Sequence, residues 1–393
     1  MATTPHTPRT TRGRRGPDGP TGDDGGTGSA RPRARPTPQH AGTDGDGGQG
    51  AFPWERTDVG ARPQGVLFDP EVERELGVGE FRGMEFLHVR ARSIINRLDR
   101  SIGLPFSHTI NAYRGCSHAC MYCFARPTHA YLGLGIGEDF DRRVVVKTNA
   151  VELLRAELSP RRWAGHAIAM GTNTDPYQRC EGKYRLTRGI IGVLGEYANP
   201  FSVLTKSTLV LRDLDVLAAA ARRTHVRVDL SVGTLDPDVW RLTEPGTPPP
   251  ARRLRAVRQL NEAGIPCGVL VAPILPGLSD ADEQIEAVVA AAAEAGARSI
   301  AHTTLHLRGQ VRDHVLAELA GCRPDLAERY DREYRRGSAP KSVRDRIARS
   351  FGRARATHAA SIGERWEPGP EPATPVEAPT PRPTTHQLTL GLP

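Results

Sequence analysis

The sequence is poor in aromatic residues, lysine and cysteine. Aromatic side chains make up 5% of the 393 residues, while glycine (41) and proline (33) are abundant, mainly near the two ends. The part of the chain that can bury a core is therefore smaller than the full length. Lysine occurs only at positions 147, 183, 206 and 341, so arginine supplies nearly all of the basic charge behind the net charge of +8. Two interpretations stay open: a coding bias toward arginine, or a polyanionic partner.

Six cysteines are too few and too unevenly spaced for a disulfide framework in a chain of this length. Three lie close together, and the other three, Cys180, Cys267 and Cys322, are scattered. This pattern favours a reducing compartment, so we expect a cytoplasmic protein. The arginine pair at 14–15 is followed by Gly, Pro and Asp and does not resemble a secretion signal. The alanine-rich run 287–295 is too short to span a bilayer, which predicts a soluble protein without a membrane segment.

Composition divides the chain into five parts. Residues 1–65 are rich in Gly, Pro, Thr, Asp and Arg, and residues 367–393 are again rich in proline. Such segments cannot bury enough apolar surface to fold, so we expect both tails to be disordered. Between them we expect an N-terminal extension that packs on the core (66–105), a core domain (106–305) and a basic helical extension (306–366).

The central region alternates short β-branched runs with helical patterns, which predicts a series of βα units. The predicted strands are Ser107–Tyr113, His166–Met170, Phe201–Leu204, Val226–Val232, Gly268–Ala272 and Ser299–Thr303. The predicted helices are Ala150–Leu158, Leu186–Tyr197, Leu211–Arg222, Arg252–Ala263 and Asp280–Ala295. Successive units of this kind indicate an α/β fold, either a parallel barrel or a doubly wound sheet. In such folds the active site lies at the C-terminal ends of the strands.

A cluster of three cysteines comes directly after the first predicted strand. Cys116, Cys120 and Cys123 have the spacing C-x3-C-x2-C, and Tyr122 stands just before the last of them. Three thiolates on one short loop can bind three corners of a [4Fe–4S] cluster and leave the fourth iron open to a substrate or cofactor. The spacing and the position therefore predict a catalytic iron–sulfur site.

Zinc is the main alternative for this loop. Structural zinc takes four ligands, usually from C-x2-C pairs, whereas here the three cysteines have unequal gaps. His118 could supply a fourth ligand, but it lies inside the short first gap. The spacing favours a cluster. A nucleic-acid-binding protein that zinc or a cluster stabilises, with no catalytic activity, stays open as the alternative function.

Four motifs carry a resemblance to a known family. They are Asn-Ala-Tyr-Arg-Gly-Cys at 111–116, Tyr-Cys-Phe-Ala-Arg-Pro at 122–127, Gly-Thr-Asn-Thr-Asp-Pro-Tyr-Gln at 171–178 and Leu-Thr-Lys-Ser at 204–207. With the βα pattern they resemble the radical S-adenosylmethionine (radical SAM) superfamily, in particular its spore photoproduct lyase-like branch and a set of uncharacterised actinobacterial proteins. The resemblance covers about residues 80–340 and implies a partial (β/α)6 barrel of the TIM type.

Polar residues after the later predicted strands are candidates for binding the cofactor. The loop 171–178 could be an ordinary turn, but the resemblance implies that its polar residues hold the methionyl amine of S-adenosylmethionine. These residues are Thr172, Asn173, Thr174 and Asp175. The resemblance also implies that Lys206 contacts the cofactor carboxylate, and that Ser231 faces the carboxylate or the ribose.

Other residues near the cysteine loop are open to two interpretations. Tyr122 either packs as an ordinary aromatic side chain or lies against the cluster loop and the adenine edge. The stretch Val269–Gly277 either packs against adenine or belongs to the core. Arg114, His118 and Arg126 could tune the cluster through hydrogen bonds or charge.

The sequence does not identify a catalytic residue. In spore photoproduct lyase a cysteine near the second-strand motif donates a hydrogen atom. The nearest thiol here is Cys180, which does not align with that role, so Cys180 is a weak candidate. A small buried side chain is the simpler interpretation, and this departure puts photolesion repair in doubt.

The resemblance implies a radical SAM enzyme that takes electrons from an electron donor. Its [4Fe–4S] cluster would cleave S-adenosylmethionine reductively to methionine and a 5′-deoxyadenosyl radical, which abstracts hydrogen from the substrate. The sequence leaves open whether that substrate is a nucleic acid, a peptide or a small metabolite. It also leaves the reaction subclass open.

Two segments near the C-terminus suggest partners. The window Tyr334–Ala356 contains eight basic residues and one acidic residue. Val343, Ile347, Phe351 and Ala354 could line one face of a helix there. The window is either a solvated helix docked by that face or a track for nucleic-acid phosphates. The terminal Gln387–Leu392 follows a proline-rich linker and loosely resembles the peptide that binds the bacterial sliding clamp.

Overall fold

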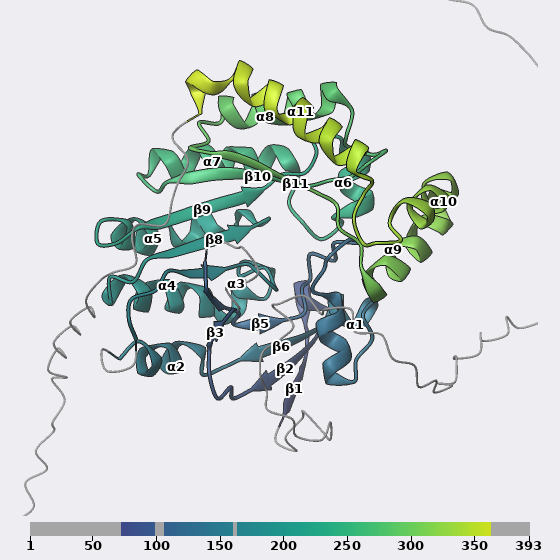
Figure 1. Ribbon diagram of the computed structural model, residues 1–393. Coiled ribbons are helices and arrows are strands. Elements are labelled where there is room, and N and C mark those ends of the chain that lie inside the picture. Colours follow the sequence, from purple (N-terminus) through teal and green to yellow (C-terminus); the bar gives the residue numbers. More distant parts are fainter. Residues whose placement is uncertain (1–71, 99–105, 160–162, 363–393) are drawn as a thin grey trace, which may run out of the picture. The chain divides into compact units, whose positions relative to one another are not determined.

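The computed structural model describes residues 72–98, 106–159 and 163–362 (Figure 1). The two predicted tails lie outside the described residues, and with them the clamp-like segment Gln387–Leu392. The division of the chain at residues 66, 106 and 306 stays a prediction.

A seven-stranded sheet with the order β11-β10-β9-β8-β7-β4-β3 forms the centre of the described residues (Figure 1). Its parallel strands are β4 (His108–Ile110), β7 (Ile168–Met170), β8 (Phe201–Thr205), β9 (Val226–Ser231), β10 (Cys267–Ile274) and β11 (Ile300–Thr304). Strand β3 (Ile95–Arg97) pairs antiparallel with β4 at one edge. Each parallel strand lies beside the one before it in sequence, with β11 and β3 as the two edges. The βα pattern predicted this α/β fold with a parallel sheet, and the six parallel strands are those expected of the partial (β/α)6 barrel that the resemblance implies.

Helices cover the outer side of this sheet (Figure 1). They are α2 (Ala150–Glu157), α4 (Leu186–Glu196), α5 (Leu214–Ala221), α7 (Pro250–Glu262) and α8 (Asp282–Glu294). The strands are rich in β-branched residues, and a large apolar core lies between sheet and helices. Helix α8 ends before Gly296, whose φ of +76° suits the left-handed residue that follows many helices.

Two predicted elements differ in detail. The predicted strand Ser107–Tyr113 ends early, because the chain turns after Ile110 and Tyr113–Arg114 pair with another sheet as β5. The first residues of the predicted helix Leu211–Arg222 belong to a 3₁₀ helix, η4 (Thr208–Asp213). The Ser207 hydroxyl accepts a hydrogen bond from the backbone N–H of Leu209 (3.1 Å) at its start, and α5 follows it.

A second sheet, which the sequence patterns did not predict, has the order β1-β2-β6-β5. Its strands are β1 (Glu73–Leu76), β2 (Glu85–Val89), β6 (Arg143–Lys147) and β5 (Tyr113–Arg114). The run of three valines in β6 was the missed signal, because such runs favour a buried strand. Pairing of β2 with β6 attaches the chain before residue 90 to the core, next to the cysteine loop.

Three helices follow the last strand: α9 (Gly309–Cys322), α10 (Pro324–Glu333) and α11 (Lys341–Thr357). Helix α11 packs on α8 at the top of Figure 1. Ile347, Phe351 and Ala354 are buried, which confirms the predicted apolar face. Shorter elements are η1 (Gly79–Phe81), η3 (Arg126–Leu132), α1 (Glu138–Arg142), α3 (Glu181–Tyr184), α6 (Pro237–Thr243) and η5 (Ala359–Ser361).

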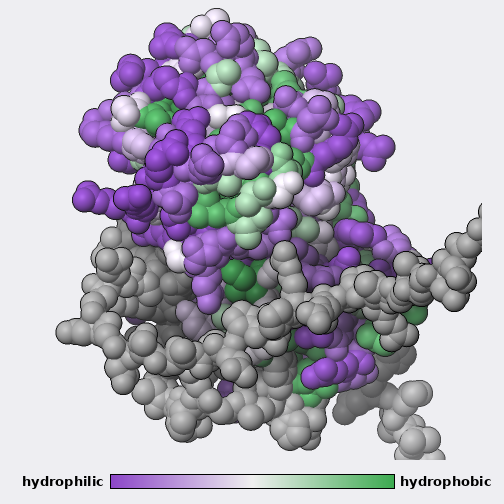
Figure 2. All heavy atoms as spheres, turned by 90° about the vertical axis from the view of Figure 1, so that its right-hand side faces the viewer, coloured by the Kyte–Doolittle hydropathy of each residue, from purple (hydrophilic) through white to green (hydrophobic). Residues whose placement is uncertain are grey.

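A second apolar cluster joins the cysteine loop to the C-terminal helices. It contains Cys120 and Tyr122 together with Val311 of α9 and Tyr330 of α10. Figure 2 shows the side of the molecule that carries these helices, where the visible coloured surface is mostly hydrophilic with smaller hydrophobic groups. No helix in the described parts of the chain has both the length and the apolar character to cross a membrane.

Candidate functional site

The cysteine loop begins where β5 leaves the second sheet. Gly115 has a φ of +85°, and a Cβ there would lie 2.8 Å from the carbonyl oxygen of Arg143. Only glycine fits this turn without strain. The next residue, Cys116, donates its backbone N–H to the carbonyl of Phe140 (2.9 Å). Cys116 and Cys120 are buried, Cys123 is half-buried, and all three thiols are free.

A buried arginine, Arg126, bonds the backbone of the cysteine loop. Arg126 is 1% exposed and donates from Nε to the carbonyl of Cys120 (3.1 Å). Its terminal nitrogens bond the carbonyls of Ile136 (2.9 Å) and Gly137 (3.1 Å) and the Asp141 carboxylate (3.0 Å). Burial raises the pKa of Asp141 to about 6, although Arg126 opposes the rise. Arg126 therefore fixes the backbone of the loop.

The last residue of α6 and the segment that follows it bond the cysteine loop from another side. Met121 donates its N–H to the carbonyl of Thr243 (3.0 Å), and Gly246 donates to the carbonyl of His118 (3.0 Å). A Cβ on Gly246 would lie 2.2 Å from the carbonyl oxygen of Ser117, so the two backbones meet at a distance that excludes any side chain.

The loop 171–178 follows β7 and supports the cysteine loop with two of its side chains. Thr174 Oγ1 (2.8 Å) and Gln178 Nε2 (2.9 Å) both donate to the carbonyl of Gly115. Gln178 Oε1 also accepts the N–H of Ser117 (3.0 Å). Thr174 was predicted to bind cofactor, and the structure commits its hydroxyl to the backbone before Cys116. The contribution of Gln178 was missed, although it belongs to the motif that carried the resemblance.

Asp175 is the centre of a separate set of bonds. Its carboxylate accepts from the Thr205 hydroxyl (2.6 Å) and from the backbone N–H groups of Lys206 (2.7 Å) and Tyr177 (2.9 Å), and it lies 3.2 Å from His118 Nδ1. Burial alone would raise the pKa of Asp175, but the His118 charge and these hydrogen bonds outweigh it and leave the pKa lowered. His118 therefore supports the loop through Asp175.

Thr172 and Asn173 remain available at the same loop. Both side chains are half-buried, and neither has a hydrogen bond to another residue in the described part of the chain. Gly171, just before them, has a φ of +87°, and a Cβ there would lie 1.9 Å from the carbonyl oxygen of Leu204. The backbone is therefore fixed while the two polar side chains stay free for a ligand.

Lys206 and Ser231, both predicted to face the cofactor, are in direct contact. Lys206 Nζ donates to Ser231 Oγ (2.6 Å), to the carbonyl of Ala272 (3.2 Å) and to Glu244 Oε1 (3.0 Å). Tyr122, the aromatic residue of the cysteine motif, donates its hydroxyl to the same Glu244 oxygen. Two predicted residues, Lys206 and Tyr122, thus meet at a carboxylate that was not predicted, and the third, Ser231, contacts it only through Lys206.

Glu244 is buried, at 3% exposed, and its second oxygen lies 2.6 Å from Arg253 Nη2. Arg253 is fully buried and also donates to the carbonyls of Pro248 (2.8 Å) and Ser231 (2.9 Å). Burial raises the pKa of Glu244, but Lys206 and Arg253 outweigh this and lower it to about 2. The network ties the cysteine loop to the ends of β8, β9 and β10.

Cys180 lies elsewhere. Its thiol is fully buried in the main core between sheet and helices, and burial raises its pKa. A hydrogen-atom donor must reach the substrate, so this position supports the interpretation of Cys180 as a small core side chain.

The chemistry of the cysteine loop fits an iron–sulfur cluster better than zinc. Burial raises the pKa of Cys116, Cys120 and Cys123, so a bound metal or cluster would have to stabilise the thiolate forms. No three His, Cys, Asp or Glu side chains within the described ranges converge on a point where they could hold one metal ion. Zinc needs such convergence, whereas cluster cysteines bind different irons around a larger volume.

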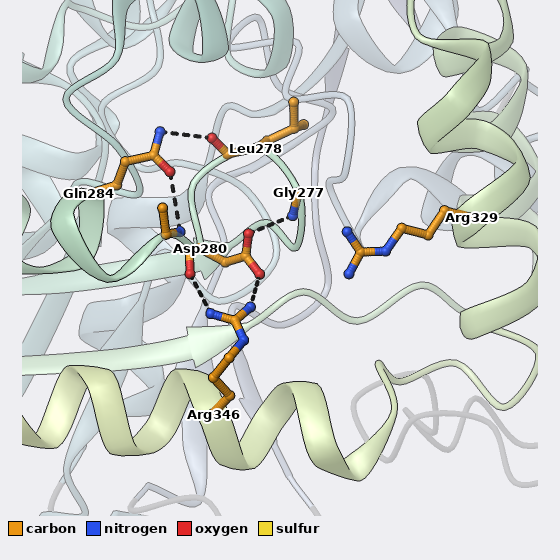
Figure 3. A pocket seen from close by; sticks show the side chains of 7 residues that line it. Gly277, Leu278, Asp280, Gln284, Arg329 and Arg346 are labelled. Atoms are coloured by element: carbon orange, nitrogen blue, oxygen red, sulfur yellow. Dashed lines mark hydrogen bonds and ion pairs between the residues drawn. The ribbon is translucent and has the colours of Figure 1, made fainter.

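A cavity of about 520 Å³ lies beyond the loop that follows β10 (Figure 3). Asp280 in its wall pairs with Arg346 of α11, and Arg329 of α10 points toward it from the opposite side. Arg329 also bonds Glu333 (2.9 Å), so its charge is already compensated. The lining is polar and contains none of the polar residues predicted to bind the cofactor. Of the stretch Val269–Gly277, Gly277 alone lines the cavity, next to Leu278.

The family model described as the radical SAM superfamily matches residues 110–289, which include the cysteine loop and the strands from β6 to β10. An uncharacterized protein of Mycobacterium tuberculosis is 45% identical over 280 residues, covering 70% of this chain and 82% of that protein. The chain belongs to the radical SAM superfamily. It is therefore a radical SAM enzyme, and such enzymes need a reductant as electron donor.

More distant proteins are also similar to this chain in sequence or in fold. An uncharacterized protein of Methanocaldococcus jannaschii is 30% identical over 200 residues, covering 51% of this chain and 71% of that protein. Among solved structures, a spore photoproduct lyase mutant matches with a TM-score of 0.54 and 18% identity, covering 71% of this chain and 81% of that chain. A second mutant, with bound AdoMet and dinucleoside spore photoproduct, matches with a TM-score of 0.52 and 18% identity, covering 70% and 80%. These similarities show that the fold is shared.

Proposed function

We propose that Cys116, Cys120 and Cys123 hold a [4Fe–4S] cluster with which the radical SAM enzyme cleaves S-adenosylmethionine. The observation that carries this proposal is the set of three free thiols on a loop whose backbone is fixed on both sides, by Arg126 and by Gly246. Bound there, the cluster and S-adenosylmethionine would supply one-electron radical chemistry that removes hydrogen from a substrate.

The chain's own residues bind and orient the cofactor. Lys206 presents an ammonium beside the hydroxyl of Ser231, a pair that suits a carboxylate. Thr172 and Asn173 offer uncommitted oxygens to the methionyl amine, while Thr174 and Asp175 hold the surrounding backbone. Tyr122 stands between Cys120 and Cys123 in the sequence, its ring centre is 5.7 Å from the Lys206 ammonium, and its burial keeps water from this side.

Anaerobic reconstitution tests the cluster. We expect a brown protein with about four irons per chain that cleaves S-adenosylmethionine under strong reductant. Cys120→Ala should retain less iron and lose cleavage, whereas Cys322→Ala, at an exposed thiol, should behave as wild type. A colourless protein that contains only zinc would instead establish the alternative, a metal-stabilised nucleic-acid-binding protein without catalysis.

For the substrate we propose a nucleic acid that contacts the basic window 334–356. The apolar face of α11 docks on the barrel, and Lys341, Arg346 and Arg353 form ion pairs with aspartates. Four exposed arginines of the window have no ion pair or hydrogen bond to other described residues: Arg335, Arg336, Arg349 and Arg355. These four could contact phosphates. The related fold of the spore photoproduct lyase mutant holds a dinucleoside.

Salt dependence of binding tests the substrate class. With all four free arginines changed to glutamine, affinity for a DNA or RNA oligonucleotide should fall, and the slope of log K against log salt should decrease by up to about 0.9 per lost contact. The matched control replaces four exposed arginines elsewhere that also lack side-chain bonds to other described residues: Arg82, Arg222, Arg252 and Arg298. No binding at low salt would contradict a nucleic-acid substrate and favour a peptide or small metabolite.

Two further proposals concern the cell. The six described cysteines are free, as expected in a reducing compartment, so we propose a cytoplasmic location.

We also propose that Gln387–Leu392 contacts the sliding clamp. Pull-down with the clamp should recover full-length protein and lose a variant that ends before residue 386, and equal recovery of both would contradict the contact.

A further inference from the structure

The ammonium of Lys206 has no donor to spare. An ammonium carries three N–H donors, and the structure gives Lys206 three acceptors: Ser231, Ala272 and Glu244. Its side chain is 14% exposed, so water does not supply an alternative shell. A carboxylate can therefore bind Lys206 only by displacing one of these acceptors.

Glu244 is the acceptor that the network can release. Its other oxygen is 2.6 Å from Arg253, and Tyr122 donates to the oxygen that Lys206 shares. If Lys206 moved away, Glu244 would keep a buried cation and a hydroxyl donor, so no charge would be left unpaired. Ser231 differs, because it donates to Ala272 (2.8 Å) and is built into the strand edge beneath the lysine.

The charges of the network leave room for one anion. Two cations, Lys206 and Arg253, surround one carboxylate, Glu244, and the exposed fractions of their side chains are 14%, 0% and 4%. Another carboxylate, Asp175, lies 3.2 Å from His118 Nδ1 and accepts the backbone N–H of Lys206 rather than its ammonium. Among these three side chains one positive charge is in excess, and this favours one further carboxylate beside Lys206.

We propose that Glu244 is a resident competitor for Lys206 that sets how tightly this site holds a ligand carboxylate. The inference rests on the proposed function, in which Lys206 binds the carboxylate of S-adenosylmethionine. On binding, Lys206 passes from Glu244 to the ligand, and Glu244 stays with Arg253. Because the methionine product carries the same carboxylate, this competition lowers the affinity for product as well as for cofactor and favours their exchange.

Equilibrium binding to the reconstituted protein tests the proposal with two ligands, S-adenosylmethionine and its decarboxylated analogue. The ratio of their affinities isolates the carboxylate. Glu244→Gln removes the competing charge, so this ratio should rise roughly tenfold, with little change for the analogue. Glu244→Asp keeps the charge near Arg253 but is one methylene shorter, so it should give a smaller rise and serves if the glutamine variant does not fold. Asp238→Asn, at an exposed carboxylate of α6, is the matched control and should leave the ratio unchanged.

Each result separates one idea from another. A ratio that stays the same or falls in both Glu244 variants overturns the competitor role, because a merely supporting residue would weaken carboxylate binding. If wild type binds both ligands equally, Lys206 does not bind the carboxylate, and the inference fails while cluster chemistry stands. If wild type binds neither ligand, the proposed function fails and the inference fails with it.

Discussion

Two groups of cations in this enzyme differ in how fully their donors are used. The first group belongs to the buried bonds around the cysteine loop, and it consists of Arg126, Arg253 and Lys206. Each of them bonds at least three acceptors. On α11, Arg346 and Arg353 each pair with an aspartate, while Arg349 has no bond to another described residue. The first group fixes geometry, because its donors have set directions, whereas on α11 Arg349 supplies charge that a partner can use. The comparison predicts that the two groups respond to substitution in opposite ways.

The largest expected effect is at Arg126. Arg126→Gln removes bonds to three carbonyls and to Asp141 from a side chain that is 1% exposed. We expect the free energy of unfolding to fall by about 3–5 kcal/mol, measured by urea denaturation, and iron content after reconstitution to fall. The control Arg142→Gln removes an exposed pair with Glu138 and should cost less than about 0.5 kcal/mol. Similar losses in both variants would remove the distinction between the two groups.

The next effect is at Glu244, and it depends on pH. The carboxyl's pKa is lowered from its usual 4.5 to about 2 in the fold. Its ionised form therefore stabilises the fold at pH above 4.5, and this contribution is lost as pH falls toward 2. Glu244→Gln should lower the free energy of unfolding by about 3 kcal/mol near pH 7.

The difference from wild type should then shrink between pH 4.5 and 2, because protonated glutamic acid and glutamine carry the same charge. Unfolding curves of wild type and variant at several pH values measure this. A difference that stays constant down to the lowest pH at which both fold would show that packing, rather than charge, accounts for the loss.

The parallel sheet and part of the candidate site could be predicted from the sequence because their signals are local. Alternating β-branched runs gave the six parallel strands, and the cysteine spacing, Lys206 and Ser231 stand within single short motifs. Glu244 could not be found this way. It lies in an ordinary polar turn, and its role arises from contact with Tyr122, which is 122 positions away. Gln178 was within reach, since it ends a motif already recognised, but its backbone partners at 115 and 117 appear only after folding.

A smaller effect should come from Gly246, where a close approach of two backbones, rather than a buried cation, fixes the cysteine loop. Gly246→Ala places a Cβ 2.2 Å from the carbonyl oxygen of Ser117, so one backbone must move. We expect a loss of about 1–3 kcal/mol and fewer irons per chain. Gly182→Ala is the control, because a Cβ there meets nothing within 4 Å and lies in helix α3, so stability should stay equal or rise slightly. Full iron content in Gly246→Ala would show that the loop tolerates displacement.

The smallest effect on stability, within about 0.5 kcal/mol, is expected for Arg349→Gln, three residues from Arg346 on α11. Arg346→Gln breaks a pair with Asp280, whose side chain is 10% exposed, and should cost about 1–2 kcal/mol in urea unfolding. Binding to an oligonucleotide should reverse the order: Arg349→Gln should reduce the salt slope by up to about 0.9, and Arg346→Gln should leave it nearly unchanged. We expect this difference because an arginine whose donors are already used cannot also hold a phosphate. If both substitutions changed stability and nucleic-acid binding to the same extent, paired and unpaired arginines would act alike, and the comparison would fail.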